Sequence, residues 1–293
     1  MSEKNKIKIA VFPVAGMGTR FLPATKASPK EMLPIVDKPL IQYAAEEAVE
    51  AGIETLIFVT GRNKISIQNH FDAAYEIEAE LERKNKKIEL ELVKNIVPKN
   101  ISCIYIRQHQ ALGLGHAVLC AKPAVGNNPF AVILADDMIL SSNKGCLKQM
   151  TERYKELNSS IIAVEKVSKE LLHKYGIIEG VKSNKTDWVL TNIIEKPNTN
   201  EAPSSMGVVG RYILKPSIFD ILSNTEKGAG EEIQLNDAIA AQLKNEKVYA
   251  YEFNGKRFDC GNKLGFLKAT IEYGLNHKEI SNDLRNYLKN LNI

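Results

Sequence analysis

Strand-like segments without a polar face alternate with helix-like segments through the first half of this sequence. Residues 55–60 (TLIFVT) are apolar on both faces, and residues 40–51 carry their apolar side chains as one helical stripe that ends before Gly52. The same patterns predict strands at 7–14, 101–107 and 130–134 and a helix at about 115–121. Continuous apolar strands separated by helices are typical of a parallel sheet that helices cover on both faces. We therefore predict a doubly wound, three-layer α/β fold with a mixed, mainly parallel central sheet.

The pattern changes after Ser159 to shorter strands with turns. We expect strands at 161–167, 187–194 and 208–214 and helices at 216–222 and 234–243, which would extend the sheet and carry a second ligand site. Residues 264–293 are helical, and we interpret them as a tail that packs on the body or on a neighbouring subunit. Between Lys64 and Lys94, Glu and Lys recur at helical spacing, which predicts a solvated helix pair with ion pairs. A subunit contact is the alternative there.

Composition excludes several classes of function. The net charge is +4 from 39 basic and 35 acidic residues, and no basic block is interleaved with aromatic residues, so we expect no nucleic-acid partner. No apolar run approaches the roughly 20 residues of a membrane-spanning helix, and the N-terminus lacks the features of a signal peptide. We therefore expect a cytoplasmic protein without a membrane partner. The four cysteines lack the paired spacing of a zinc or redox motif, and we expect reduced, mostly buried thiols.

The first predicted strand ends in a glycine-rich turn, PVAGMGTR at 13–20. Ligands bind at the carboxyl ends of parallel strands. Gly16 and Gly18 permit a close approach of the backbone, so that N–H groups can point at an anion, and Arg20 adds a charge that suits phosphate. A dinucleotide fingerprint needs a third glycine where Phe21 stands, and no GK[ST] sequence closes the loop as in a Walker motif. We therefore interpret residues 13–20 as a phosphate-binding turn, with a purely structural turn as the alternative.

Four prolines stiffen the segment that follows, FLPATKASPKEMLPIVDKP at 21–39. We expect this segment to present Lys26 and Lys30 beside the glycine turn. Together with Arg20, these lysines would stabilise a triphosphate and the pyrophosphate that leaves it, which is the main requirement of phosphoryl transfer.

Acidic residues follow two further strand-like segments. Asp136 and Asp137 come after the apolar run FAVILA, and Asp259 lies in FDCG. Mg²⁺ takes one or two carboxylates together with phosphate oxygens and water, so one acid from each segment would suffice. A helix cap or a turn is the alternative role for each of them. If the first strand persists, Asp136 and Asp137 point in opposite directions.

The stretch 13–39 resembles the signature of bacterial UTP–glucose-1-phosphate uridylyltransferases, which belong to the sugar nucleotidyltransferases. Further motifs extend the similarity over most of the chain: RQHQALGLGHAV (107–118), LADD (134–137), KYGI (174–177), IIEKP (193–197), VVGRYIL (208–214), EIQLNDA (232–238) and RFDCGNKLG (257–265). The resemblance implies a Rossmann-like nucleotidyltransferase domain at 1–263 with a helical C-terminal tail at 264–293. Residues 1–140 would mainly bind the nucleotide, and residues 141–263 would mainly bind the sugar phosphate.

The resemblance also implies which residues form the site. The nucleotide would be bound by Ala15, Gly16, Gly18, Thr19, Arg20, Lys30, Gln108 and Gly113. Gln108 and Gly113 would read the uracil edge, and an amide that donates and accepts at once matches a pyrimidine imide. The sugar phosphate would be bound by Gly176, Glu195, Lys196 and Val209, with Glu195 on glucose hydroxyls and Lys196 on the phosphate. An exposed Glu–Lys pair is the alternative for residues 195 and 196.

Asp136 and Asp259 would hold Mg²⁺ by the same resemblance, and Asp137 would support them. The implied reaction joins UTP and glucose 1-phosphate to give UDP-glucose and pyrophosphate, with Arg20, Lys30 and Lys196 as catalytic residues that position substrates and stabilise charge. Related enzymes that use dTTP, CTP or another sugar phosphate share this machinery, and an inert nucleotide-sugar regulator is a second alternative. The resemblance further implies a homodimer or a homotetramer.

Overall fold

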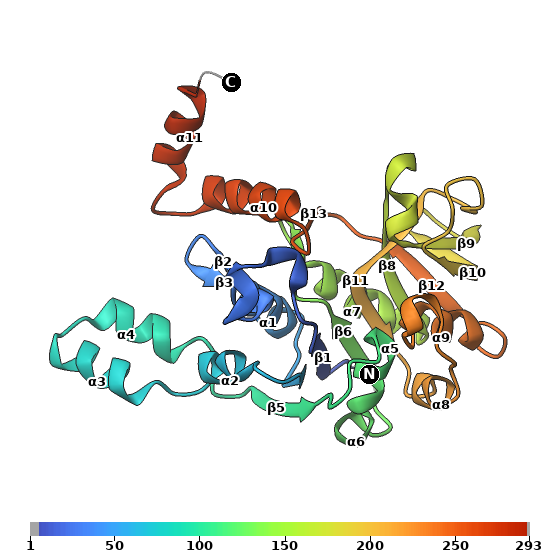
Figure 1. Cartoon of the computed structure of the whole chain (residues 1–293), viewed down its shortest axis with the longest axis horizontal. Coiled ribbons are helices and arrows are strands. Elements are labelled where there is room, and N and C mark those ends of the chain that lie inside the picture. Colours follow the sequence, from blue (N-terminus) through green and yellow to red (C-terminus); the bar gives the residue numbers. More distant parts are fainter. Residues whose placement is uncertain (1–5, 292–293) are drawn as a thin grey trace.

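A nine-stranded mixed sheet forms the centre of the computed structural model, which describes residues 6–291 (Figure 1). The strand order is β5-β4-β1-β6-β11-β8-β12-β10-β9. The strands of the first half are β1 (Ile9–Val14), β4 (Thr55–Thr60), β5 (Ser102–Arg107) and β6 (Phe130–Ile133). Those of the second half are β8 (Ser160–Lys166), β9 (Gly176–Lys182), β10 (Asp187–Glu195), β11 (Met206–Leu214) and β12 (Val248–Glu252).

The two halves of the sheet differ in strand direction. Strands β5, β4, β1 and β6 are all parallel, as the apolar runs predict. Beyond β6, only β8 and β12 pair in parallel, while β11 runs antiparallel to β6 and β8, and β10 runs antiparallel to β9 and β12. The sheet is mixed, but the prediction that it is mainly parallel is right only for the first half. A short connection such as residues 183–186 can join only antiparallel strands, whereas parallel strands need a long crossover.

Helices pack on both faces of this sheet, and each face has its own apolar cluster. Phe12 and Ala10 of β1 lie in the cluster that also holds residues of α1 (Leu40–Glu50), α2 (Ile65–Phe71) and α7 (Cys146–Leu157). Val11, between them, lies in the opposite cluster. That cluster includes residues of α5 (Leu114–Cys120), α6 (Lys122–Val125), α8 (Ile218–Ser223) and α9 (Leu235–Gln242). The alternation along β1 explains why this strand reads as apolar throughout.

Two small ribbons and several turns complete the body. β2 (Pro34–Ile35) pairs with β3 (Lys38–Pro39), and β7 (Asp137–Leu140) pairs with β13 (Lys256–Asp259) so that Asp137 lies opposite Asp259. The 3₁₀ turns are η2 (Thr19–Phe21), η3 (Ala24–Lys26), η4 (Lys30–Met32), η5 (Lys169–Lys174) and η6 (Ala229–Glu231). The β7–β13 ribbon joins segments more than a hundred residues apart, and periodicity alone did not predict it.

Four helices lie at the periphery. α3 (Tyr75–Arg83) and α4 (Lys87–Lys94) have no buried residue and carry ion pairs such as Glu80–Arg83, which confirms the predicted solvated helix pair (Figure 1). α10 (Lys263–Asn276) packs on β13 and β2, and α11 (Ser281–Lys289) packs on α10.

The expected domain boundaries at 140 and 263 stay predictions. The helical tail predicted at 264–293 is two helices separated by residues 277–280, and residues 292 and 293 lie outside the described range. Strands β9 and β12 were not predicted. The other predicted helices and strands agree with the structure to within about two residues, the usual uncertainty at element ends.

The cysteines carry no disulfide in the structure. Cys146 and Cys260 are buried, while Cys103 and Cys120 are half-buried, so burial is less complete than we expected. Burial raises the pKa of each of these thiols. Within residues 6–291, no helix is both long enough and apolar enough to cross a membrane.

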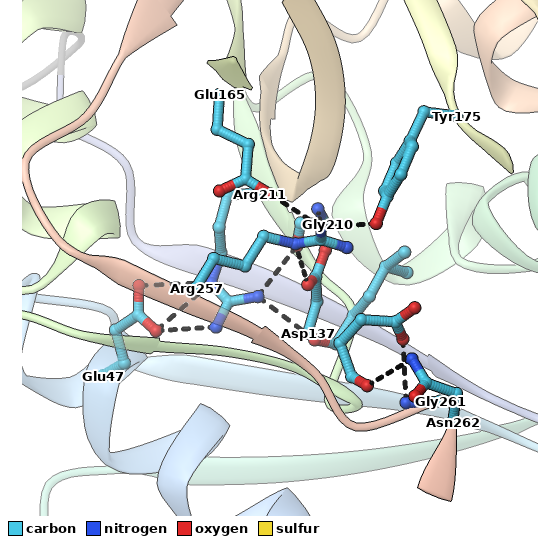
Figure 2. A network of polar contacts seen from close by, with 11 residues as sticks. Glu47, Asp137, Glu165, Tyr175, Gly210, Arg211, Arg257, Gly261 and Asn262 are labelled. Carbon is cyan, nitrogen blue, oxygen red and sulfur yellow. Dashed lines mark hydrogen bonds and ion pairs between the residues drawn. The ribbon is translucent and has the colours of Figure 1, made fainter. Parts of the chain in front are cut away.

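A buried ion pair connects the two halves of the sheet. Arg211 of β11 has a side chain only 2% exposed, and its Nη2 lies 2.7 Å from Oε2 of Glu47 in α1 (Figure 2). Its Nη1 donates to the carbonyls of Gly210 and of Leu134, which follows β6. Glu47 Oε1 also accepts from the backbone N–H of Leu147 in α7. Burial opposes the charge on Arg211, but Glu47 outweighs it and raises the pKa of the guanidinium.

Replacing one member of this pair should destabilise the fold strongly. We expect Glu47→Leu to lower the free energy of unfolding by about 3–5 kcal/mol, because it leaves Arg211 buried and charged without its partner. The double variant Glu47→Leu/Arg211→Met should be less destabilised than this single variant. Urea unfolding followed by circular dichroism measures both. As a control, Lys122→Ala removes an exposed pair with Asp220 and should have little effect. A Glu47→Leu protein as stable as that control would contradict the assignment.

Candidate active site

A cavity of about 590 Å³ lies where the first-half strands end, and residues from both halves of the chain line it. Because β1, β5 and β6 are parallel, the segments after them meet at one edge of the sheet. All residues that the family resemblance assigns to the nucleotide, the sugar phosphate and the metal line this cavity: Ala15, Gly16, Gly18, Thr19, Arg20, Lys30, Gln108, Gly113, Asp136, Gly176, Glu195, Lys196, Val209 and Asp259. The structure therefore brings all of them together, while their individual roles stay predictions.

The glycine turn is held against the proline-rich segment. Gly18 has φ +68°, and a Cβ there would lie 3.1 Å from Cβ of Lys30. The hydroxyl of Thr25 donates to the Gly18 carbonyl at 2.7 Å. Lys26, which we expected beside the turn, is exposed and does not line the cavity, because it lies in the separate turn η3. Lys30 is thus the lysine that this segment delivers to the site.

Lys30 and Asp136 form a close ion pair inside the cavity, with Nζ 2.6 Å from Oδ2. Burial lowers the pKa of Lys30, but the charges of Asp136 and Glu31 and the hydrogen bond to Asp136 together outweigh it, so the pKa is raised above its ordinary value. Burial likewise acts against ionisation of Asp136, and Lys30 brings the pKa of that carboxyl below its ordinary value. Both groups therefore stay charged. The adjacent Glu31 is buried and pairs with Lys64 at 2.7 Å, which fixes the turn that carries Lys30.

Two carboxylates and one guanidinium converge above Gly261. A Cβ at this glycine would lie 2.9 Å from Oδ1 of Asp259, 3.0 Å from Oδ2 of Asp136 and 3.3 Å from Nη1 of Arg20. The absent side chain at Gly261 thus leaves a small space between oxygens from β13 and from the turn after β6. Within residues 6–291, no group of three or more His, Cys, Asp or Glu side chains could hold a metal ion. Two carboxylates fit a cation such as Mg²⁺, which keeps water and phosphate oxygens as its other ligands.

Asp137 has different partners from Asp136. Its carboxylate accepts from the N–H of Gly210 at 2.6 Å and pairs with Arg257 (Figure 2). Arg257 also donates to Glu165 at 2.8 Å and to the hydroxyl of Tyr175 at 3.0 Å. Because Arg257 and Asp259 lie on the same short strand, this network ties the strand that carries Asp259 to the second half of the sheet.

The side-chain amide of Gln108 is already hydrogen-bonded within the chain. It is buried, and its Nε2 donates to the Gly113 carbonyl at 3.2 Å and contacts Nδ1 of His116 at 2.9 Å. Burial lowers the pKa of His116, which favours the neutral imidazole that can accept this bond. In this conformation both amide hydrogens are engaged within the chain, which leaves Oε1 as the atom that can accept from a base. The role of Gln108 in reading the uracil edge stays a prediction.

The predicted sugar residues come together through strand pairing. In the register of β9 with β10, Gly176 lies opposite Glu195. Glu195 is 12% exposed, so it is not a surface side chain, and its Oε1 lies 3.1 Å from Nζ of Lys196. Asn236 donates from Nδ2 to the other oxygen of Glu195 at 2.7 Å. Val209 is buried in β11.

Sequence reasoning missed several residues that line the cavity: Tyr175, Glu232, Gln234, Asn236 and Arg257. Each of these residues lies within a motif that we quoted, so the motifs were the available signal. Their positions in the cavity depend on strand register and on contacts between distant segments, which spacing along the chain does not contain.

Comparison with known proteins agrees with this geometry. A family model described as nucleotidyl transferase matches residues 10–274. The UTP–glucose-1-phosphate uridylyltransferase of Staphylococcus epidermidis is 48% identical over 288 residues, which is 98% of this chain and 99% of that protein. The enzyme of the same name from Bacillus subtilis is 48% identical over 287 residues, which is 98% of this chain and 97% of that protein.

Solved structures give the same result. A UDP-glucose pyrophosphorylase complexed with UDP-glucose is 48% identical, with a TM-score of 0.86 over 92% of this chain and 100% of that one. The UTP-bound enzyme from Acinetobacter baumannii is 46% identical, with a TM-score of 0.91 over 97% of this chain and 99% of that one. The α/β nucleotidyltransferase fold and the resemblance stated from the motifs are both confirmed. The chain belongs to the nucleotidyl transferase family and, within it, to the UTP–glucose-1-phosphate uridylyltransferases.

Proposed function

We propose that this protein transfers the uridylyl group of UTP to glucose 1-phosphate, giving UDP-glucose and pyrophosphate. The observation that carries this proposal is that the glycine turn with Arg20 and Lys30 and the pair Glu195 and Lys196 line one and the same cavity. The cavity therefore has cations from both halves of the chain, which can offset the repulsion between two anionic substrates. The 48% identity to curated uridylyltransferases supports the choice of UTP and glucose 1-phosphate.

The chemistry needs positioning and charge stabilisation more than a base. A phosphate oxygen of glucose 1-phosphate attacks the α-phosphorus of UTP, and pyrophosphate leaves from the opposite side. The attacking phosphate is already ionised near neutral pH, so no side chain has to remove a proton. Arg20 and Lys30 stabilise the charge on the triphosphate, and Lys196 brings the sugar phosphate close to it. Gln108 and the backbone at Gly113 hold the base, while Glu195 holds sugar hydroxyls.

Asp136 and Asp259 would hold Mg²⁺ in the space above Gly261. When bound, the cation supplies charge stabilisation to phosphate oxygens. Lys30 would also have a second role, since its Nζ lies 2.6 Å from Oδ2 of Asp136 and balances the charge of that carboxylate.

The main alternative is a related transferase that prefers dTTP or CTP, since uracil and thymine differ by one methyl group. A putative glucose-1-phosphate thymidylyltransferase from Bacillus anthracis shares the fold at a TM-score of 0.67 but is only 21% identical. An inert regulator would have lost the catalytic groups, and this chain retains Asp136, Asp259 and Lys196. Location in the cytoplasm and assembly into a homodimer or homotetramer stay predictions.

Pyrophosphate release by the purified protein tests the proposal. UTP, dTTP, CTP, ATP and GTP are each combined with glucose, galactose, mannose and N-acetylglucosamine 1-phosphates in the presence of Mg²⁺. We expect UTP with glucose 1-phosphate to dominate. Dominance of another pair would overturn the base or sugar assignment, and a folded protein that releases no pyrophosphate with any pair would overturn the activity.

Gly113 should be essential for nucleotide binding. Its φ is +98°, and a Cβ there would lie only 2.6 Å from Cβ of Glu232, so Gly113→Ala must displace the loop that carries the base contact. We expect the KM for UTP to rise roughly tenfold or more. Gly52→Ala is the matched control, since Gly52 has φ +92° with no atom within 4 Å of the added carbon. Equal UTP KM values for the two variants would contradict the prediction.

Lys196 should act in turnover. Lys196→Ala is expected to lower kcat roughly hundredfold, because a charge that stabilises the transition state is lost, with a smaller change in the KM for UTP. Steady-state kinetics at saturating Mg²⁺ measures this. Lys185→Ala, at an exposed position, is the control. Unchanged turnover in Lys196→Ala would remove this residue from the catalytic group.

The metal assignment predicts a specific change in Mg²⁺ dependence. Asp259→Asn keeps the shape of the side chain but removes its charge, so the Mg²⁺ concentration for half-maximal rate should rise roughly tenfold. Titration of Mg²⁺ at fixed UTP checks this. Asp283→Asn in α11 has no place in the cavity and serves as the control. A Mg²⁺ response identical to that of the control would exclude Asp259 as a ligand.

A further inference from the structure

We propose that Asn236 is a positioning residue that holds Glu195 in the orientation needed to recognise the sugar. The inference rests on the proposed function and adds a residue that selects the sugar phosphate. Asn236 belongs to α9, whereas Glu195 ends β10, and the two side chains meet at 2.7 Å between Nδ2 and Oε2. Both residues line the cavity. Helix α9 therefore acts on the sugar end of the site through one hydrogen bond.

Glu195 needs the hydrogen bond from Asn236 because its other partner, Lys196, is proposed to bind the phosphate of the sugar. Its Oε1 lies 3.1 Å from Lys196, whose side chain is 49% exposed and can move. When Lys196 turns to the phosphate of the sugar, it leaves Glu195. The amide of Asn236 is then the contact that keeps the carboxylate in place. A charged acceptor forms a stronger hydrogen bond than a neutral one, so a single amide donor is enough.

The orientation of the Asn236 amide supports this role. Its Oδ1 is buried, and among residues 6–291 no donor lies within hydrogen-bond distance of it. A flipped amide would place this oxygen against the Glu195 carboxylate, where two acceptors repel. The protein therefore tolerates an unpaired buried oxygen so that Nδ2 can face Glu195. Buried polar atoms without partners are rare because they are costly, and they call for a functional explanation.

Gly176 gives a second, independent observation. A Cβ at this position would lie 2.2 Å from Nδ2 of Asn236 and 3.1 Å from Oε2 of Glu195. No left-handed φ requires glycine there. Glycine at 176 therefore makes room for the Asn236–Glu195 hydrogen bond, in addition to lining the sugar site.

The surrounding charge requires a neutral donor at 236. The next residue, Asp237, is half-buried, and burial and then the charge of Glu195 raise the pKa of its carboxyl. An aspartate at 236 would place a third carboxylate next to these two. Asn236→Asp should therefore repel Glu195, whereas Asn236→Ala only removes the hydrogen bond.

Steady-state kinetics of Asn236→Asp and Asn236→Ala tests the proposal. We expect the KM for glucose 1-phosphate to rise roughly tenfold or more in both variants, and further in Asn236→Asp, while the KM for UTP changes less than about twofold. The preference for glucose over galactose 1-phosphate should narrow, because a displaced Glu195 reads the hydroxyls less strictly. Asn95→Asp is the matched control: Asn95 also donates to a glutamate, Glu91, at 2.9 Å, but on an exposed helix.

Calorimetry separates this inference from the proposed activity. The variants should lose affinity for UDP-glucose and keep their affinity for UDP, a comparison that needs no turnover. A wild-type protein without activity would overturn the proposed function, while the calorimetric comparison would still test Asn236. An unchanged KM for glucose 1-phosphate in an active variant would overturn the role of Asn236. A parallel loss of UTP or UDP binding would also overturn it, by showing a general structural defect.

Discussion

Buried charge at the centre of the molecule is the constraint on which the rest of the structure depends. Arg211 is almost completely buried and is stable there because Glu47 and two backbone carbonyls satisfy its donors. These partners come from α1, from the turn after β6 and from β11 itself. An apolar pair could have joined the same elements, but it would not fix their relative position as strictly. The arrangement sets the turn after β6, and that turn carries Asp136.

A second ion pair, between Asp137 and Arg257, lies next to the cavity and fixes the segments that line it. The carboxylate of Asp137 binds the backbone of β11, and the guanidinium of Arg257 binds Glu165 of β8. Asp136 and Asp259 are the direct or near neighbours of these two residues in the chain. The acids proposed to hold Mg²⁺ therefore occupy positions that the fold determines before any ligand arrives. Such preorganisation is what charge stabilisation requires, because groups that are already oriented need no rearrangement during the reaction.

The sequence was informative where the physical signal is local. Apolar runs identified β1, β4 and β6, and ordered motifs predicted which residues line the cavity, including Gln108 and Asp259. It was less informative where the outcome depends on distant contacts. The antiparallel direction of β11 is set by its neighbours, and a strand's own composition does not encode direction. Asn236 and Arg257 could not be assigned roles from the sequence, because their partners are distant along the chain. Glu195 is 41 residues from Asn236, and Asp137 is 120 residues from Arg257. Only the folded sheet brings these residues together. The expected position of Lys26 was wrong for a similar reason, since the local sequence does not show that Lys26 lies in a separate, exposed turn, η3.

The segment that leads into α9, together with its first turn, contacts both the loop that carries Gly113 and the side chain of Glu195. The N–H of Ile233 donates to Leu112 and its carbonyl accepts from Gly115, so it braces the loop that carries Gly113, and Asn236 reaches Glu195 three residues later. The residues proposed to bind the base and the sugar therefore share one stretch of backbone. A point substitution at Asn236 leaves that backbone in place, so the sugar contact can change alone. An insertion or deletion within residues 232–236 would instead displace both contacts at once.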